Sequence, residues 1–190
     1  MKRQIKAIAK SLTYSMTDSG AKAYLKEIKK SAKGKNLSFV IWKFIAAELR
    51  ALPTTTVKVQ SVIDPVIAGM DLLANGKDWP KADARRAASA AYVVRTGQNS
   101  LAADAVSNSL AADAASDAAL AAFNVGNAAC MAAYAAWVAN DVRTSKAHKR
   151  AAHDPSISAI TYAFYKNDAR FRQSERLLKL VKSSPEKKEQ

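Results

Sequence analysis

Residues 99–107 read NSLAADAVS and residues 108–116 read NSLAADAAS, so a nine-residue unit occurs twice in tandem. The repeat lies within residues 82–139, where 24 of 58 positions are alanine. Small side chains let neighbouring helices approach closely, because the distance between helix axes depends on the side chains at the contact. This stretch therefore predicts a closely packed, alanine-rich centre in an all-α protein.

The period of nine residues constrains how this stretch is buried. At about 100° per residue, nine residues turn a helix by roughly two and a half turns. In one continuous helix the two copies would therefore face opposite directions. The period predicts either burial on two sides or a break in the helix, and capping by Ser100 and Ser109 would place that break near Asn108.

Two amphipathic helices are predicted near the N-terminus from apolar residues at three- and four-residue spacing. The first series is Ile5, Ile8, Ala9, Leu12 and Met16. The second series follows residues 17–20 and consists of Ala21, Tyr24, Leu25, Ile28 and Ala32. Gly34 is suited to the left-handed backbone at the C-terminal stop of the second helix.

The next segment predicts the helix at the centre of the core. Residues 39–52 read FVIWKFIAAELRAL and are apolar on nearly every side. Ser38 is the predicted cap, and the helix is expected to stop before Pro53. The following TTTVKVQSVI, residues 54–63, is rich in β-branched residues but has no second strand to pair with. We interpret it as a connector or the start of a helix.

Proline and glycine positions mark the later helices. Asp64 and Pro65 are predicted as the cap and first residue of a helix that ends at Gly76, and Pro80 opens the next helix. Beyond residue 117, one apolar stripe consists of Leu120, Phe123, Cys130, Met131, Tyr134, Trp137 and Val138. A last helix, after Asp154 and Pro155, is predicted to bury Ile157, Ile160, Phe164, Phe171, Leu178 and Val181.

The whole sequence predicts one all-α domain. Only six glycines and five prolines occur in 190 residues, too few for the frequent turns of an all-β fold. We expect a single-domain bundle of about six to eight helices over residues 1–182 and a disordered tail over residues 183–190. Basic helices are expected over 2–52, an Ala-rich bundle over 64–145 and a basic C-terminal helix over 156–182.

A membrane span and a secreted location are both disfavoured. Residues 118–140 carry no charge and are long enough to cross a bilayer. However, three asparagines and the high alanine content of this segment oppose insertion. The lone Cys130 cannot form an internal disulfide, and the charged N-terminal segment does not read as a signal peptide. We therefore expect a cytoplasmic protein.

The sequence contains no recognisable catalytic or metal-binding pattern. Two histidines and one cysteine are too few for a zinc site, and His148 and His153 lie too far apart around a helix to chelate together. No phosphate-binding glycine loop or nucleophile elbow occurs. We expect a non-enzymatic protein that has no cofactor and no small-molecule substrate.

Positive charge is concentrated in the first quarter of the chain. The formal net charge is +14, and residues 1–50 carry 12 basic and 3 acidic side chains. Between Lys22 and Lys35 the only acid is Glu27. Solvated helix faces usually carry both signs, so this imbalance makes an anionic partner as good an interpretation as an exposed face that only confers solubility.

The candidate binding residues lie on the basic helices predicted at the two ends of the chain. They are Lys2, Arg3, Lys6, Lys10, Lys22, Lys26, Lys29, Lys30, Lys33, Lys35, Arg170, Arg172, Arg176 and Lys179. The partner is either an acidic protein surface or nucleic acid, in which case the lysines would contact phosphates without reading bases. A membrane surface is a weaker alternative. The Ala-rich helices also allow two copies to pair.

Part of the chain resembles a known group of proteins. Residues 64–94, DPVIAGMDLLANGKDWPKADARRAASAAYVV, are followed at 100–123 by SLAADAVSNSLAADAASDAALAAF. A proline-initiated helix that leads into pairs of alanines is similar to the Ala-rich immunity proteins of bacteria and phages. The resemblance covers about residues 64–140 and implies a helical, non-enzymatic protein of a mobile element or its host that neutralises a partner. Asp64 departs from the arginine usual there, and no functional residue carries over.

Overall fold

The computed structural model describes residues 2–13, 16–52, 56–96, 103–123 and 170–187. These residues form an all-α bundle of seven helices, as the sequence predicts. Six of them are α1 (Lys2–Leu12), α2 (Asp18–Ser31), α3 (Val40–Arg50), α4 (Val57–Ala74), α5 (Lys81–Thr96) and α6 (Ala103–Phe123). The seventh comprises residues 170–182 and is called the C-terminal helix below.

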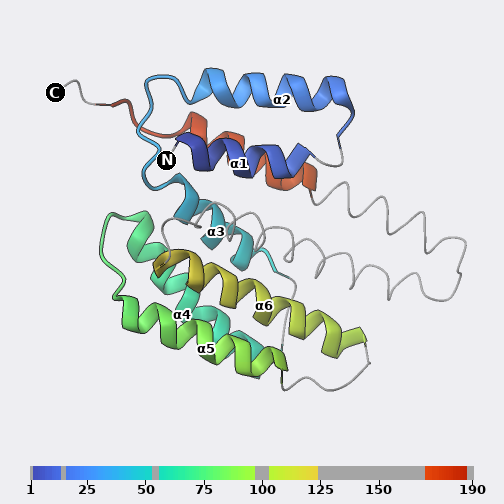
Figure 1. The fold of residues 1–190 in the computed structure, drawn as a ribbon, viewed down its shortest axis with the longest axis vertical. Helices are drawn as coiled ribbons and strands as arrows, with labels where there is room; N and C mark the ends of the chain where they lie inside the picture. The colour runs from blue at the N-terminus through green and yellow to red at the C-terminus, as the bar shows by residue number, and fades with distance from the viewer. Residues whose placement is uncertain (1, 14–15, 53–55, 97–102, 124–169, 188–190) are drawn as a thin grey trace, which may run out of the picture.

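The helices are stacked one after another along the long axis of the molecule, with α3 between two groups (Figure 1). At one end, α2 lies alongside α1 and the C-terminal helix. At the other end, α4, α5 and α6 pack against one another. Because α3 contacts α1, α4 and α6, the buried apolar residues of all seven helices form one continuous cluster.

The two N-terminal helices form as predicted. In α1, Ile5, Ile8, Ala9 and Leu12 are buried as predicted. The helix ends at Leu12, so the prediction that Met16 extends it is wrong. Thr17 caps α2 by accepting a hydrogen bond from the Gly20 N–H at 3.2 Å. After α2, Gly34 has a φ of +75°, the predicted left-handed stop.

Helix α3 is buried on nearly every side, which agrees with its predicted central place. The predicted cap at Ser38 is wrong, because α3 begins after Phe39 and has no side-chain cap. The Ser38 N–H instead donates to the Asn36 side-chain oxygen at 3.1 Å, which holds Ser38 in the preceding turn.

Helix α4 starts eight residues before the predicted start. Thr56 caps it, and Pro65 lies in its interior, so the prediction that Asp64 and Pro65 begin a helix is wrong. An interior proline costs about 3 kcal/mol because it lacks the N–H for one helical bond. Burial of Val59, Ile63 and Val66 offsets this cost, since each such side chain contributes roughly 1.5–3 kcal/mol.

The end of α4 and the start of α5 agree with the sequence. Gly76 adopts a φ of +71° just after the helix. The carbonyl of Pro80 then accepts hydrogen bonds from the N–H groups of Asp83 and Ala84 at 2.9 and 3.0 Å, which begins α5.

The nine-residue repeat runs into one continuous helix. Helix α6 continues through Asn108, so the predicted break there is wrong. Six buried alanines of the second copy and of the residues just after it span an arc of about 160°: Ala111, Ala112, Ala114, Ala115, Ala118 and Ala119. The side chains of the first copy lie outside the described ones. Ser116 donates a 3.2 Å hydrogen bond to the carbonyl of Ala88 and thereby ties α6 to α5. These six alanines are buried within one chain.

The C-terminal helix buries a different face from the predicted one. Val181 is buried as expected, but Leu177 is fully buried where Leu178 was predicted, and Leu178 is only half-buried. Phe171 is 57% exposed, whereas Arg170 is only 7% exposed. Beyond this helix, the N–H of Lys187 donates to the carbonyl of Gly34 at 2.7 Å. The predicted disordered tail is therefore wrong for residues 183–187, and residues 188–190 lie outside the described ones.

Several predictions concern parts of the chain that the structure does not describe. They are the apolar stripe beyond residue 123, the roles of Cys130, His148 and His153, and the helix start at Asp154 and Pro155. Among the described helices, none has the length and apolar character needed to cross a membrane.

Candidate anion-binding groove

Three lysines of α2 lie on one stripe of the helix, and a fourth follows in the turn after it. Lys22, Lys26 and Lys29 follow one another at spacings of four and three residues, Lys33 lies two residues beyond the end of α2, and all four are exposed. At 100° per residue the three helical positions fall within an arc of about 60°. Their ammonium groups therefore project from one side of α2 over about 10.5 Å of its length.

A groove between α1 and α2 runs beside this stripe. Its volume is about 700 Å³, and it is lined by Ile5, Lys6, Leu25, Lys26, Ile28, Lys29, Ala32, Lys33 and Leu37. Ile5, Ile28 and Leu37 belong to the buried core, and Leu25 and Ala32 are half-buried against it. The groove thus has an aliphatic floor and lysines contributed by both helices.

The lysines that line the groove have no acid beside them. None of Lys6, Lys26, Lys29 and Lys33 forms an ion pair with any residue in the described ranges. The one acid of α2 beyond its first residue, Glu27, lies about 130° around the helix from the middle of the lysine stripe. Neither Glu27 nor any other acid in the described ranges therefore neutralises the lysines at the groove.

Glu27 is instead occupied on the side of α2 that faces the C-terminal helix. Its carboxylate forms a 2.8 Å ion pair with the Lys182 ammonium. The hydrogen bond and positive charge of Lys182 lower the pKa of Glu27 below its ordinary value. This ion pair helps to orient α2 so that the lysine stripe faces away from the C-terminal helix.

Two further contacts fix α2 in place. The Tyr24 hydroxyl donates to the carbonyl of Ser174 at 3.3 Å. At the other end of α2, Lys35 pairs with Glu186 in an isolated antiparallel bridge, and their side chains form a 2.6 Å ion pair. Lys35 was a predicted binding residue, and this pairing takes it out of the candidate surface.

The remaining N-terminal candidates lie close to the groove or on its helices. Lys6 lines the groove, and Lys10 is exposed on α1. Lys30 is exposed on α2 but does not line the groove. The backbone of Lys2 and Arg3 belongs to α1, while their side chains are outside the described part.

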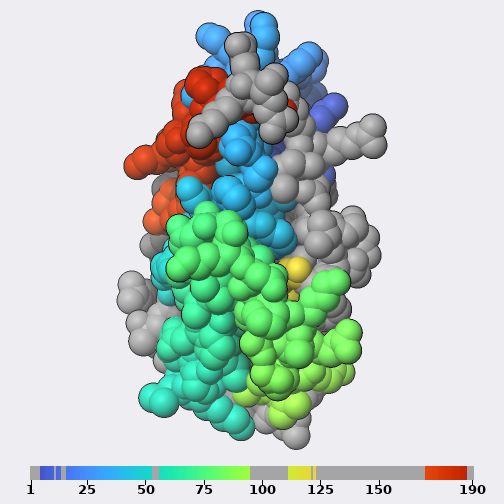
Figure 2. All heavy atoms as spheres, turned by 90° about the vertical axis from the view of Figure 1, so that its left-hand side faces the viewer, coloured from blue at the N-terminus to red at the C-terminus, as the bar shows by residue number. Residues whose placement is uncertain are grey.

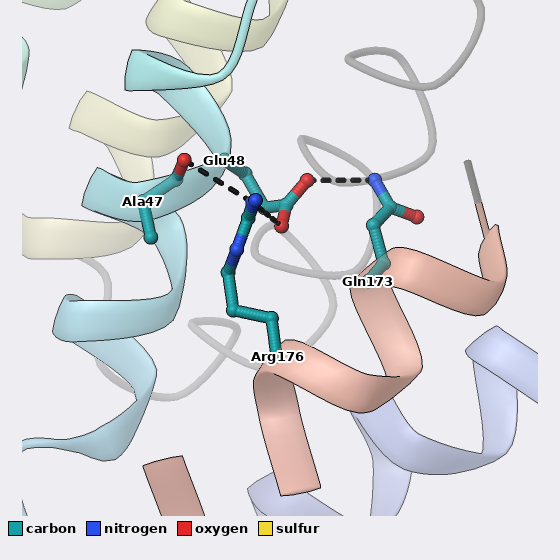
Figure 3. A network of polar contacts seen from close by, with 4 residues as sticks. All are labelled: Ala47, Glu48, Gln173 and Arg176. Atoms are coloured by element: carbon teal, nitrogen blue, oxygen red, sulfur yellow. Dashed lines mark hydrogen bonds and ion pairs between the residues drawn. The ribbon is translucent and has the colours of Figure 1, made fainter. Parts of the chain in front are cut away.

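The C-terminal candidates do not form a second basic surface. Arg170 is buried, and Arg176 pairs with the carboxylate of Glu48 in α3 and donates to the carbonyl of Ala47 at 3.3 Å (Figure 3). Including these two residues in an exposed binding surface was therefore wrong. Arg172 and Lys179 are exposed, and Lys179 lines a hollow that also contains Glu175, so the charge there is mixed.

The pairing of Arg176 with Glu48 was not predicted from the sequence. Glu48 is the one acid in α3, a helix whose other residues are apolar except for the exposed Lys43 and Arg50, and its side chain is 3% exposed. Gln173 donates to its second oxygen at 2.9 Å, so both carboxylate oxygens are hydrogen-bonded (Figure 3). A lone acid in a helix that is apolar on every side is a signal that a basic partner lies within the core.

Comparisons with protein-family models, curated proteins and solved structures find no match to this chain. Among the described residues no group of three or more histidine, cysteine or carboxylate side chains lies together as a metal site would require. The groove between α1 and α2 is the feature from which a function can be argued.

Proposed function

We propose that this chain is a non-enzymatic binding protein that inhibits or regulates an acidic protein partner through the groove between α1 and α2. The observation that carries the proposal is the position of four lysines around an aliphatic floor, and none of these lysines forms an ion pair within the described part of the chain. An acidic protein surface supplies carboxylates for the lysines and aliphatic side chains for the floor. Electrostatic complementarity of this kind speeds association and selects among partners.

The composition of the groove favours protein over nucleic acid. Proteins that bind nucleic acid without reading its sequence combine a basic groove with aromatic side chains on which bases stack. Among the residues that the structure describes, no aromatic side chain lines this groove. A duplex would place phosphates against the lysines and would leave Leu25 and Ala32 without an apolar partner.

The resemblance of residues 64–140 to Ala-rich immunity proteins supports the type of action. It implies that binding neutralises the partner and that the chain comes from a phage or another mobile element. In the proposed arrangement, the Ala-rich helices α5 and α6 form the scaffold, and α1 and α2 present the binding surface. The protein would act in the cytoplasm.

The test compares two charge-reversal variants that change the net charge equally. One is Lys26→Glu, Lys29→Glu and Lys33→Glu in the groove. The matched control is Lys58→Glu, Lys77→Glu and Lys81→Glu, three exposed lysines of the α4–α5 end. Binding of fluorescent poly-glutamate to the full chain should weaken at least about tenfold in the groove variant, because three exposed ion pairs are replaced by repulsion.

Binding of poly-glutamate in the control variant should stay within about twofold of the wild type. Equal weakening in both variants would show that only net charge matters and would contradict the proposal. The same measurement with a DNA duplex covers the nucleic-acid alternative. If the duplex bound more tightly than poly-glutamate and depended on the same three lysines, the partner would be nucleic acid instead.

A further inference from the structure

The geometry of the groove points to the form of the partner, and this inference rests on the proposed function. We infer that the segment bound there is an acidic amphipathic α-helix that lies along α2. Its apolar stripe would pack on the groove floor, and acids flanking that stripe would pair with the lysines. Laying an amphipathic helix into an apolar groove is a recurrent mode of peptide recognition.

The floor of the groove is already formed in the free chain. Ile5, Ile28 and Leu37 are almost completely buried in the core, so they cannot move to close the groove without unpacking α1 and α2. Leu25 and Ala32, seven residues apart on α2, remain half-exposed above them. An apolar stripe of a second helix would cover these two residues and leave its own polar side in water.

The lysine spacing matches a helical partner. Lys26 and Lys29 are separated by about 4.5 Å along the axis of α2, and Lys33 follows in the turn just beyond the helix. A helix lying beside α2 presents acids at the same separation of about 4.5 Å when they are three residues apart, and an acid further along it would face Lys33. Lys6 reaches the groove from α1, so acids on both flanks of the apolar stripe would find a partner.

The spacing of the lysines argues against a ligand with a single acidic group. A volume of about 700 Å³ would admit the chain of a long carboxylic acid. However, one carboxylate would satisfy only one end of a row of ammonium groups about 10.5 Å long. A ligand with several acids along one apolar body uses the whole groove, and an acidic amphipathic helix has that composition.

The test uses two synthetic peptides of identical composition and the full-length protein. One peptide places leucines on a single helical stripe with glutamates on both flanks. In the other, the same residues are scrambled so that no helical face is apolar. We expect the amphipathic peptide to bind at least about tenfold more tightly in a fluorescence anisotropy titration, because only it can bury an apolar face together with its ion pairs.

A floor variant locates this preference in the groove. Leu25→Gln should remove most of the difference between the two peptides, whereas Leu72→Gln, a matched change of an exposed leucine in α4, should leave it intact. Thermal unfolding of both variants verifies that they fold. Retention of the full preference in Leu25→Gln would overturn the placement in the groove.

The outcomes separate this inference from the proposed function. If both peptides bound equally and the lysine variant still lost poly-glutamate binding, the helix inference would fail and the proposed function would stand. If the lysine variant lost neither poly-glutamate nor peptide binding, both would fail. Displacement of the amphipathic peptide by a DNA duplex at lower concentration than by unlabelled peptide would also overturn the inference.

Discussion

At the scale of single residues, Glu48 shows how a charge is held inside the bundle. Its carboxylate accepts hydrogen bonds from Arg176 and Gln173, and its side chain is 3% exposed (Figure 3). Taking two charges out of water is costly, and removing one partner of such a pair leaves the other without compensation. The Glu48 network thus joins α3 to the C-terminal helix, which in turn positions α2.

We predict that Glu48→Ala lowers the free energy of unfolding by about 3 kcal/mol, because it leaves the Arg176 guanidinium in a partly buried site without its carboxylate. Urea unfolding measures this change. The matched control is Asp71→Ala, which breaks the exposed pair between Asp71 and Arg50 and should cost less than about 1 kcal/mol. Equal losses in the two variants would show that the Glu48 pair contributes no more than a surface pair.

We predict that the buried phenol of Tyr24 makes the free energy of unfolding depend on pH. Burial raises the pKa of Tyr24 above its ordinary value near 10. The folded chain therefore keeps the phenol protonated at pH values where the unfolded chain ionises. This contribution to stability is complete below about pH 10 and is lost as the pH rises toward the folded-state pKa.

In urea unfolding between about pH 9 and 11, the free energy of unfolding of the wild type should fall more steeply with pH than that of Tyr24→Phe. Loss of the hydrogen bond to Ser174 shifts the variant by a constant amount and does not change the slope. Two parallel curves would contradict a protonated, buried phenol.

Single residues differ in how far their surroundings could be predicted from sequence. The stripe of Lys22, Lys26 and Lys29 follows from helical periodicity, because all three lie on α2. The pairing of Glu48 with Arg176 does not, because 128 residues separate them and only the packing of two helices brings them together. The same holds for Lys35 and Glu186.

At the scale of elements, α4 and α5 are joined by a close contact at a glycine. A Cβ atom added to Gly69 would lie 2.2 Å from a ring carbon of Trp79. Gly69 therefore allows the buried Trp79 ring to pack directly on the backbone of α4. The glycine is required here by this approach, although alanine is the better helix former.

We predict that Gly69→Ala lowers the free energy of unfolding by about 2 kcal/mol, because overpacking exceeds the gain of roughly 1 kcal/mol in helix propensity. Thermal or urea unfolding measures the loss. The same change made in a Trp79→Leu background should cost little or become stabilising, since the ring is gone. A loss of equal size in both backgrounds would exclude the ring as its cause.

We predict that residues 184–187, which follow the C-terminal helix, restrain the end of α2. The N–H of Asn36 donates to the carbonyl of Pro185 at 2.8 Å, and Glu186 pairs with Lys35. A chain that ends at Ser183 loses both contacts, so amide hydrogen exchange in α2 should accelerate while that in α4 is unchanged. A chain that ends at Lys187 keeps both contacts and is the control. Unchanged exchange of α2 in both truncated chains would show that the segment does not restrain it.

The boundaries of elements were harder to predict than their type. Local signals located Thr17, Gly34 and Gly76 correctly at or near the helix ends. The helix start predicted from Pro65 is wrong. Buried residues before and after the proline keep α4 continuous, and their burial outweighs the helical hydrogen bond that the proline removes. The repeat could not distinguish a break from burial on two sides, since that depends on whether other helices cover α6.

At the scale of the whole molecule, the basic helix α2 and the helices α4 and α5 occupy opposite ends. Figure 2 shows α2 and the C-terminal helix at one end and α4 and α5 at the other. Sequence predicted the all-α class, the Ala-rich packing and the basic character of the N-terminal helices. The groove could not be predicted, because it exists only where α1 and α2 meet and leave their aliphatic residues partly uncovered.

The central claim is that an acidic partner binds at the groove between α1 and α2 and nowhere else on the described surface. The most direct measurement is NMR of the full chain with isotope-labelled lysine, titrated with the acidic amphipathic peptide. The Nζ signals of Lys6, Lys26, Lys29 and Lys33 should shift together and saturate, while those of Lys58, Lys77 and Lys81 stay in place. Shifts spread evenly over both groups, or confined to the second, would contradict the account.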